Sequence, residues 1–314
     1  MPFGRLAPAS VVWEYKRVDK RSAMGGYMRI IIAAIIWGSI GVVLRLINLP
    51  VPLVVFYRVF FAAVTILVYV AVRHETGKLA AGKNIYWIIL MGALLALNWT
   101  SFFYAIKLTT IANAVLLTYT SPILVAILAP IVLKERLERI TVITLLISLA
   151  GAVLIASPSV IGLDKTHIMG LAWGFVSAMT YAALVLIAKP LTGRVDVLAI
   201  LFFEELSCAA VLSPSLFIYK ISISATTLLI LFGMGAIQTA LSAGLYLSGL
   251  REVKAQQVGV FTYLDPVSAT VFAAIFLHEL PSITTLIGGA LIIASGLILV
   301  LVTRERIRAE VVSE

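Results

Sequence analysis

The amino-acid sequence predicts an all-α integral membrane protein with ten transmembrane helices arranged as two inverted five-helix repeats. Three observations lead to this prediction. The 314 residues are 61% hydrophobic and 12% charged, whereas a soluble globular domain is about 45–50% apolar and about 25% charged. Lys and Arg lie almost entirely between long apolar runs. A pattern of residues in the first half of the chain also recurs in the second half.

Ten apolar runs are each long enough to cross the hydrocarbon core of a bilayer, which takes about 17–25 helical residues. Charged residues, Pro or Gly bound each run, and the connections are too short to hold a soluble domain. In chain order the expected spans are 29–47, 52–72, 85–106, 111–133, 140–157, 168–188, 197–219, 226–249, 255–277 and 282–302.

The segments outside these spans are short. Residues 1–28 are basic but lack the apolar core of a cleaved signal peptide, so we expect a cytoplasmic tail. Residues 303–314 are expected to form a second cytoplasmic tail. Between the tails, residues 29–157 and 168–302 each hold five of the expected spans.

The distribution of positive charge predicts the orientation. With the amino terminus in the cytoplasm, nineteen Lys and Arg residues fall in cytoplasmic segments. Only four fall outside, namely Arg45, Lys107, Lys165 and Lys220. Cytoplasmic loops of membrane proteins carry the excess of Lys and Arg. We therefore expect a multi-pass plasma-membrane protein with both termini cytoplasmic, in contact with the lipid bilayer, and we assign the net charge of +9 to these loops rather than to nucleic-acid binding.

The repeat is visible at an offset of 144 residues. The pattern Thr118-Tyr119-x-x-Pro122 recurs as Thr262-Tyr263-x-x-Pro266, and the spacing of Ala, Ile, Leu and Glu over 129–135 recurs over 273–279. Each half has an odd number of spans, so the second copy enters the membrane in the opposite sense. Such inverted repeats, related by a pseudo-two-fold axis in the membrane plane, are typical of proteins that open alternately to the two sides.

Four charged residues, Arg58, Glu204, Glu205 and Asp265, lie well inside the expected spans, away from their ends. A charge there costs at least about 2.5 kcal/mol and so marks a functional candidate. Arg58 is predicted to face a central cavity and receive a substrate carboxylate; a side chain extending to the outer surface and a structural ion pair are the alternatives. Glu204 and Glu205 point about 100° apart on a helix, so we expect at most one to face the cavity squarely. The sequence leaves open whether they exchange protons during a cycle or pair with Arg58.

Two prolines predict helix breaks at corresponding positions of the two halves. Ser121 precedes Pro122, and Asp265 precedes Pro266. Pro removes a backbone donor, and Ser or Asp before it is suited to cap the helix that resumes. Asp265 is nevertheless also a candidate for ligand binding, because transporters with broken helices bind their ligands at such positions.

Uncharged polar and aromatic side chains complete the predicted cavity. They suit an amphipathic organic solute, although hydrogen bonds between helices and anchoring at the membrane interface are alternatives. These candidates are Asn98, Trp99, Tyr104, Asn113 and Tyr119 in the first half, and Gln238, Tyr246, Gln257 and Tyr263 in the second. Glu135 and Glu279 are expected to mark the membrane boundary.

Several classes of protein are disfavoured. There is no Walker A sequence. His74, His167 and His278 fall in separate loops, and Cys208 is the only cysteine, so we expect no metal, no cofactor and no catalytic site. A non-transporting scaffold or assembly component is the alternative from another class, and the inverted duplication argues against it.

Taken together, the motifs resemble those of the drug/metabolite transporter superfamily, specifically the EamA-type ten-helix permeases. The motifs are Trp37-Gly38, Phe56-Tyr57-Arg58 and the run 118–136, with counterparts at Trp173-Gly174 and over 263–279. The resemblance implies a permease that exports amino acids, related metabolites or drugs from a central cavity, with uptake as the alternative. In this family Glu often stands where this chain has Asp265, and the pair Glu204-Glu205 is a further departure, so the charge of the substrate is left open. Proton coupling and homodimer formation are also left open.

Overall fold

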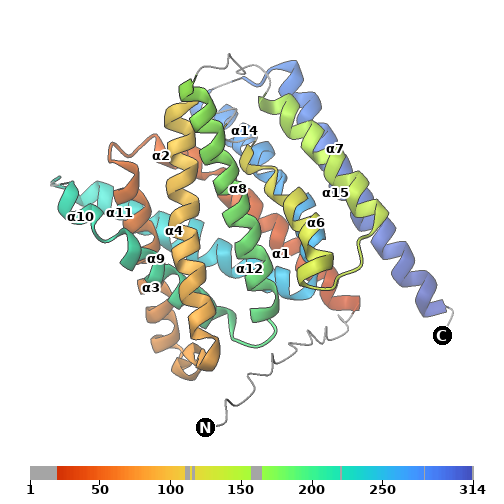
Figure 1. Ribbon diagram of the computed structural model, residues 1–314, viewed down its shortest axis with the longest axis horizontal. Coiled ribbons are helices and arrows are strands. Elements are labelled where there is room, and N and C mark those ends of the chain that lie inside the picture. Colours follow the sequence, from red (N-terminus) through yellow and green to blue (C-terminus); the bar gives the residue numbers. More distant parts are fainter. Residues whose placement is uncertain are drawn as a thin grey trace, which may run out of the picture.

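A computed structural model describes residues 20–109, 114, 117–156, 165–219, 221–278 and 280–312 (Figure 1). Within these described ranges, eight helical segments are long and apolar enough to cross a membrane. They are Ala23–Leu44, Val51–Val72, Gly82–Leu108, Ile168–Leu191, Val197–Ile218, Ala225–Glu252, Ala255–Leu277 and Ile283–Thr303. Two shorter apolar helices, Ser121–Val132 and Arg139–Ile155, lie between the third and fourth of them in the chain. The chain is therefore an all-helical, multi-pass membrane protein, while the count of ten spans stays a prediction.

The described elements follow the order of the expected spans. The first half contains α1 (Lys20–Gly38), α2 (Ile40–Leu44), α3 (Val51–Val72), η1 (Thr76–Leu79), η2 (Gly82–Asn84), α4 (Ile85–Leu108), α6 (Ser121–Val132) and α7 (Arg139–Ala156). The second half contains α8 (Lys165–Leu191), α9 (Val197–Leu212), α10 (Ser215–Ile218), α11 (Ala225–Gly233), η4 (Met234–Leu241), α12 (Ser242–Glu252), α13 (Ala255–Thr262), α14 (Leu264–Leu277) and α15 (Ile283–Val312). The segment η4 is a π-helix.

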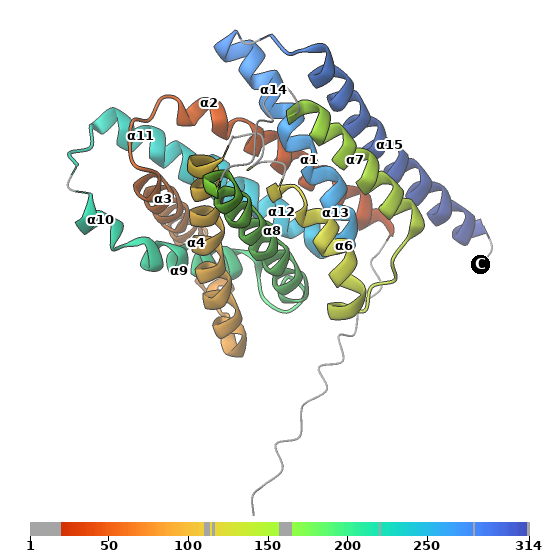
Figure 2. The same cartoon turned by 45° about the horizontal axis from the view of Figure 1, so that its top comes forward.

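Helices from the two halves pack against each other. Helix α7 lies along α15 at one edge of the molecule (Figures 1 and 2). Their backbones come close at Gly151, where a Cβ atom would stand 2.6 Å from the carbonyl oxygen of Gly288. Ser148 and Ser295 share a hydrogen bond of 2.5 Å between their hydroxyls. Small residues permit this approach, and in lipid close packing drives helix association.

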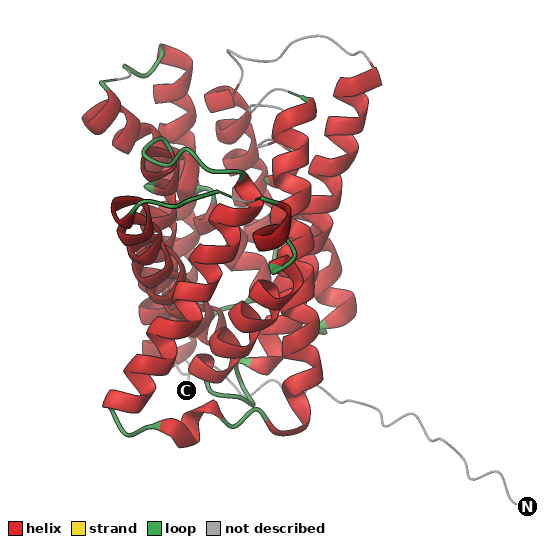
Figure 3. Cartoon of the chain, turned by 90° about the vertical axis from the view of Figure 1, so that its left-hand side faces the viewer, coloured by secondary structure: helices red, strands yellow, loops and turns green. Residues whose placement is uncertain are grey.

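Helix α1 begins at Lys20, earlier than the expected start at 29. Tyr27, expected in a tail, is buried and donates a hydrogen bond of 2.8 Å from its hydroxyl to Oε1 of Gln257. Gly26 lets α1 approach α12 closely, because a Cβ atom there would lie 2.9 Å from Cβ of Glu252. At the other end of the chain, α15 continues as helix to Val312, through most of the expected tail. Every described element is a helix or loop (Figure 3).

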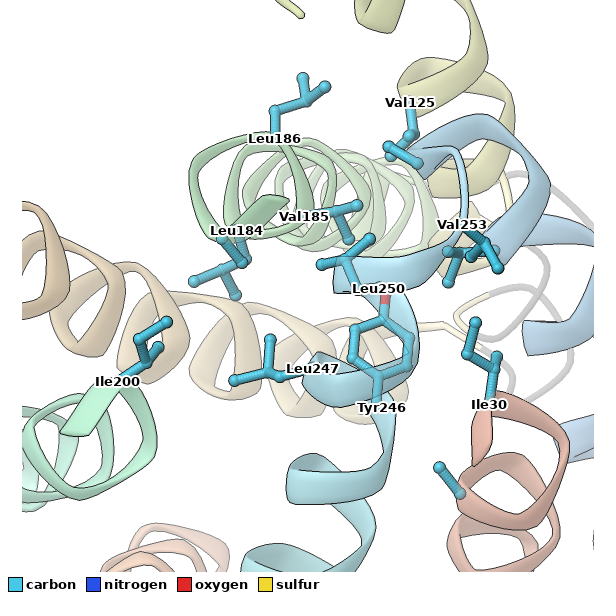
Figure 4. Close-up of a cluster of buried hydrophobic side chains, with 14 of the residues drawn as sticks. Ile30, Val125, Leu184, Val185, Leu186, Ile200, Tyr246, Leu247, Leu250 and Val253 are labelled. Carbon is cyan, nitrogen blue, oxygen red and sulfur yellow. The ribbon is translucent and has the colours of Figure 1, made fainter. Parts of the chain in front are cut away.

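The centre of the molecule is filled by aliphatic and aromatic side chains from both halves. Leu184 and Val185 of α8 face Leu247 and Leu250 of α12, with Tyr246 beside them (Figure 4). This core holds the middle of α8 against α12.

Both expected helix breaks are present. Helix α6 begins at Ser121, and α14 begins at Leu264, so Pro122 and Pro266 lie in the first turns of the helices that resume. The missing N–H of Pro needs no partner in a first turn. The capping expected from Ser121 and Asp265 is not found at these two positions, because the N-cap residues are Thr120 and Tyr263 and neither side chain makes a capping hydrogen bond.

Candidate functional site

A cavity of about 240 Å³ lies between helices of both halves. All four charged residues predicted from the spans line it, namely Arg58 from α3, Glu204 and Glu205 from α9, and Asp265 from α14. Arg58 is far from the other three in the sequence. Helix α3 packs on α9, and α14 packs on α1, which in turn packs on α12; this packing brings the four residues together. The remaining wall is mostly aromatic and aliphatic.

Arg58 is held by three neighbours. Its Nε donates a hydrogen bond of 2.8 Å to Oγ1 of Thr239. Its guanidinium carbon lies 4.2 Å from the centre of the Trp99 ring, which is a cation–π contact. Glu205 interacts with it electrostatically, although the described residues include no direct ion-pair partner for Arg58. Since only 6% of Arg58 is exposed, the side chain does not extend to the outer surface.

The π-helix η4 positions Thr239 for this contact. A π-helical turn holds more residues than an α-helical turn, and such turns are frequent at functional sites. Gly235 permits α3 to approach, because a Cβ atom there would lie 2.8 Å from the carbonyl oxygen of Arg58. In the same segment, the side chain of Gln238 donates to Oγ of Ser39 at 2.6 Å. Gln238 thus connects η4 to the junction of α1 and α2 and does not line the cavity.

Glu204 and Glu205 both line the cavity, where we expected at most one to face it squarely. Both side chains are buried, with exposed fractions of 7% and 3%. Oε2 of Glu205 has no hydrogen-bond partner among the described residues. Helix α9 packs tightly on α4 here, since a Cβ atom on Gly92 would stand 2.5 Å from the carbonyl oxygen of Glu204. The two carboxylates reach the cavity from adjacent positions because their side chains are long.

The two helix breaks meet at a pair of tyrosines. The Tyr119 hydroxyl donates to Oδ2 of Asp265 at 3.1 Å, and the Tyr263 hydroxyl donates to the Tyr119 carbonyl oxygen. The two rings are 5.6 Å apart between centres. Asp265 lies in the first turn of α14, where the helix dipole favours a negative charge. Tyr119 and Asp265 line the cavity, whereas Tyr263 is fully buried beneath them.

Asn98 and Tyr246 also line the cavity. Asn98 donates to the carbonyl oxygen of Ser177 at 2.7 Å, so it connects α4 to α8. Tyr246 accepts a hydrogen bond of 3.4 Å from Tyr181 and packs on Trp37 with ring centres 5.2 Å apart. For Asn98 the sequence left two roles open, a place in the cavity wall and a hydrogen bond between helices. The structure shows both.

The remaining predicted residues lie elsewhere. Tyr104 is 48% exposed and lines a second pocket of about 70 Å³, which it shares with Trp99 and Lys107. Gln257 accepts its hydrogen bond from Tyr27 at the far end of α13. Asn113 lies outside the described residues.

Several cavity residues were not predicted as part of the site, and three of them make contacts described above. Trp37 was identified only as part of a repeated motif, Tyr181 follows the second copy of that motif by about two helical turns, and Thr239 stands next to Gln238. An aromatic residue following Trp173 on the same helix face is a signal that could have found Tyr181. No sequence pattern marks a π-helix, so Thr239 could not be found in that way.

A cluster of polar contacts connects the two halves at the end of the molecule where α1 begins. Within the second half, the Lys189 ammonium donates to the carbonyl oxygens of Leu250, at 2.6 Å, and of Val253, and so holds the segment that meets the first half. Oε1 of Glu135 accepts a hydrogen bond of 3.2 Å from the backbone N–H of Ala255. Burial raises the pKa of the Glu135 carboxyl, and the nearby Lys189 opposes that shift. Glu135, expected to mark only a boundary, is thus a buried contact between the halves.

Further contacts extend the cluster. Lys254 makes an ion pair with Glu138, and the Gln256 amide donates to the carbonyl oxygen of Arg136 at 2.8 Å. We call these contacts of Glu135, Glu138, Lys189, Lys254 and Gln256 the terminal-face cluster. It joins the segment after α6 to the segment between α12 and α13.

Comparisons with known proteins give one consistent result. The model of the EamA-like transporter family matches residues 24–157 and again residues 168–302. An "Uncharacterized transporter" of Archaeoglobus fulgidus is 27% identical over 274 residues, which cover 87% of this chain and 95% of that protein. An "S-adenosylmethionine uptake transporter" of Rickettsia prowazekii is 24% identical over 247 residues, covering 79% of this chain and 82% of that protein.

A solved crystal structure has a similar fold. It matches with a TM-score of 0.78 at 19% sequence identity and covers 89% of this chain and 98% of that chain. At this identity the match supports the arrangement of the helices and carries no information on substrate.

Proposed function

Because this chain belongs to the EamA-like transporter family, we propose that it is a ten-span secondary transporter, which exports a small organic metabolite through the plasma membrane by alternating access. That it is a membrane transporter and not an enzyme follows from its family and relatives. The direction, the substrate and the inverted arrangement are parts of the proposal. The observation that carries it is the cavity in which Arg58, Glu204, Glu205 and Asp265 converge from helices of both halves.

Two observations support the inverted arrangement. The family model matches each half of the chain separately. Tyr119 and Tyr263, which correspond at the offset of 144, contact each other. Equivalent residues of two units touch when they lie near the symmetry axis that relates the units. The proposed axis therefore passes close to this tyrosine pair, beside the cavity.

The terminal-face cluster supports alternating access. It connects the two halves at one end of the molecule through the hydrogen bonds of Glu135 with Ala255 and of Gln256 with Arg136, and through the ion pair of Lys254 with Glu138. A transporter that rocks one unit against the other must break such contacts to open that end. We therefore assign the cluster to the closed side of the state described by the structure.

Uptake is the second candidate for direction. The relative from Rickettsia prowazekii is named as an uptake transporter, whereas the permeases that the motifs resemble often export. The cavity geometry is compatible with both directions, since a carrier's direction depends on the gradients that drive it.

Purified protein in liposomes tests the proposal. Flux of a panel of labelled metabolites is measured with the gradient applied in either direction, for wild type, Arg58→Ala, Glu204→Gln and the loop control Glu75→Gln. Glu75 lies outside the cavity and pairs with Lys78. We expect wild-type flux from the control and at least tenfold lower flux from both cavity variants. Wild-type flux from both cavity variants would contradict the assignment of the site.

We propose in addition that protons are the coupling ion. The charged groups that line the cavity are Arg58, Glu204, Glu205 and Asp265. A buried carboxylate without a partner favours its neutral form, so solute binding and proton binding compete. Substrate added to one side should then drive a pH change inside liposomes loaded with a pH-sensitive dye. Flux without any proton movement would exclude this coupling.

A further inference from the structure

The charges that line the cavity do not balance. Glu204, Glu205 and Asp265 supply three carboxyl groups, and Arg58 supplies one guanidinium. In a low-dielectric site, unpaired charges of one sign favour a ligand of the opposite sign. The composition of the lining therefore favours a positive solute.

Arg58 already has partners at its Nε and on one face of its guanidinium. Its Nε donates a hydrogen bond of 2.8 Å to Oγ1 of Thr239. The Trp99 ring covers one face of the guanidinium, with its centre 4.2 Å from the guanidinium carbon. Glu205 interacts with the guanidinium electrostatically. A substrate carboxylate arriving here would meet a cation that has other partners and a carboxylate that repels it.

The three carboxyl groups have unused hydrogen-bond acceptor positions. Oε2 of Glu205 is buried and has no hydrogen-bond partner in the described part of the chain, and Glu205 is 3% exposed. Glu204 is 7% exposed and has no hydrogen bond to any other described residue. Among the described residues, the carboxyl group of Asp265 accepts one hydrogen bond, from Tyr119 at 3.1 Å. An ionised carboxylate offers about four acceptor positions, so each acid can still bind a donor or cation.

The aromatic wall fits the same ligand. Trp37, Trp99, Tyr119, Tyr181 and Tyr246 line the cavity. The negative faces of aromatic rings attract cations, including quaternary ammonium groups that donate no hydrogen bond. The rings also offer apolar surface to the rest of a small organic molecule.

We propose that the cavity binds an organic cation, a solute with an ammonium or sulfonium group on a small apolar body, and that Glu204 and Asp265 hold its positive group. Arg58 then keeps Glu205 neutralised and does not receive a substrate carboxylate. This inference rests on the proposed function, because it names the substrate class of the same cavity.

The test is binding to the purified full-length protein, read from tryptophan fluorescence, since Trp37 and Trp99 line the cavity. The probes share a phenyl group and a short chain and differ in charge: 2-phenylethylamine, 2-phenylethanol and 3-phenylpropanoate. Benzyltrimethylammonium adds a cation that cannot titrate. We expect each cation to bind with a Kd at least tenfold below that of the carboxylate.

Matched variants assign the site. Glu204→Gln and Asp265→Asn should each weaken cation binding at least tenfold, Glu204→Asp should restore part of it, and Glu75→Gln should leave it unchanged. Melting temperatures confirm that each variant is folded. Equal or tighter binding of the carboxylate, or no cation binding at 10 mM probe, would overturn the inference. Cation binding without flux in liposomes would instead contradict the proposed transport function, so the two failures are distinguishable.

Discussion

Arg58 illustrates how one intramembrane charge is accommodated at the scale of a residue. A charge at the centre of a bilayer is costly, and breaking a buried pair by removing one partner costs about 3–5 kcal/mol. Three interactions offset the cost of burying Arg58: the hydrogen bond to Thr239, the contact with the Trp99 ring and the electrostatic attraction of Glu205. The position of Arg58 in its span was sufficient to predict it as a cavity residue, but its partners come from helices that are remote in sequence.

Arg58→Lys is expected to lower flux at least tenfold although it keeps the charge. A lysine ammonium is a point charge without the planar group that stacks on Trp99 and without an Nε donor at the same place. Flux in liposomes and the melting temperature check the result. Arg73→Lys, at the end of α3 and outside the cavity lining, is the matched control. Equal flux from Arg58→Lys and wild type would show that charge alone suffices.

Tyr119→Phe removes the hydroxyl that donates to Asp265 and keeps the ring. A hydrogen bond to a charged group is worth about 1.5–3 kcal/mol, so we expect solute affinity to change by about tenfold or more. Titration of the fluorescence signal measures the affinity. Tyr69→Phe, at an exposed position on α3, should change nothing. If Tyr119→Phe has wild-type affinity, the hydroxyl does not orient Asp265.

At the scale of the element, the helix breaks were predictable and the π-helix was not. Proline fixes its φ angle and lacks a backbone N–H wherever it occurs, so Pro122 and Pro266 were sufficient to predict both breaks. The π-helical geometry of η4 depends instead on packing of Gly235 against α3 and on the bonds of Thr239 and Gln238. Such contacts exist only once the helices have assembled. The early start of α1 was missed for the same reason, since Tyr27 is held by a residue of α13.

Gly38→Ala tests the packing of α1 on α14. A Cβ atom at Gly38 would lie 2.0 Å from Oγ of Ser268 and 2.7 Å from the backbone nitrogen of Ala269. Overpacking of this kind costs about 1–3 kcal/mol, so the melting temperature should fall. Gly41→Ala is the control, because nothing lies within 4 Å of its added Cβ atom. Equal melting temperatures for the two variants would show that α14 can move away from the added Cβ atom without loss of stability.

At the scale of the whole molecule, the all-helical membrane fold could be predicted from the sequence. Long apolar runs without charged residues specify membrane-spanning helices through local sequence alone. The sequence did not predict which helices pair. Helix α7 packs on α15 and α1 packs on α12, and these contacts join segments far apart in the chain. The terminal-face cluster was missed because Glu135 and Lys189 look like ordinary boundary charges until the halves are brought together.

Lys189→Met should loosen the closed side. The variant removes the buried ammonium from the carbonyl oxygens of Leu250 and Val253, which hold the segment that contacts the first half, and it removes a positive charge that acts on Glu135. In a Cys208→Ala background, a cysteine at the cavity-lining position Ala188 should react several times faster with a charged thiol reagent.

Lys78→Met is the control for that experiment. It breaks a partly exposed ion pair with Glu75, outside the terminal-face cluster, and such pairs contribute little to stability. Thiol labelling should therefore stay near the wild-type rate. Labelling in Lys78→Met as fast as in Lys189→Met would contradict the assigned role of Lys189.

Reporter fusions to the two ends of the chain test its orientation. The excess of Lys and Arg in alternate loops predicts a cytoplasmic location for both termini. A cytoplasm-dependent fluorescent reporter should be active at either end, and a reporter that needs export should be inactive. Activity of the export-dependent reporter at one end would refute the predicted topology.

The pairing of α7 with α15 also has a consequence for biogenesis. Helix α7 ends at Ala156 and α15 begins at Ile283, so 126 residues must be translated before the partner emerges. At about 5–20 residues per second, the face of α7 that carries Gly151 stays without its partner in the membrane for about 6–25 s. During that interval it is accessible to insertion factors, quality-control proteases and other nascent chains. Substitutions at Gly151 or Gly288 should therefore reduce the amount of protein that a cell accumulates before they alter the flux of the molecules that mature.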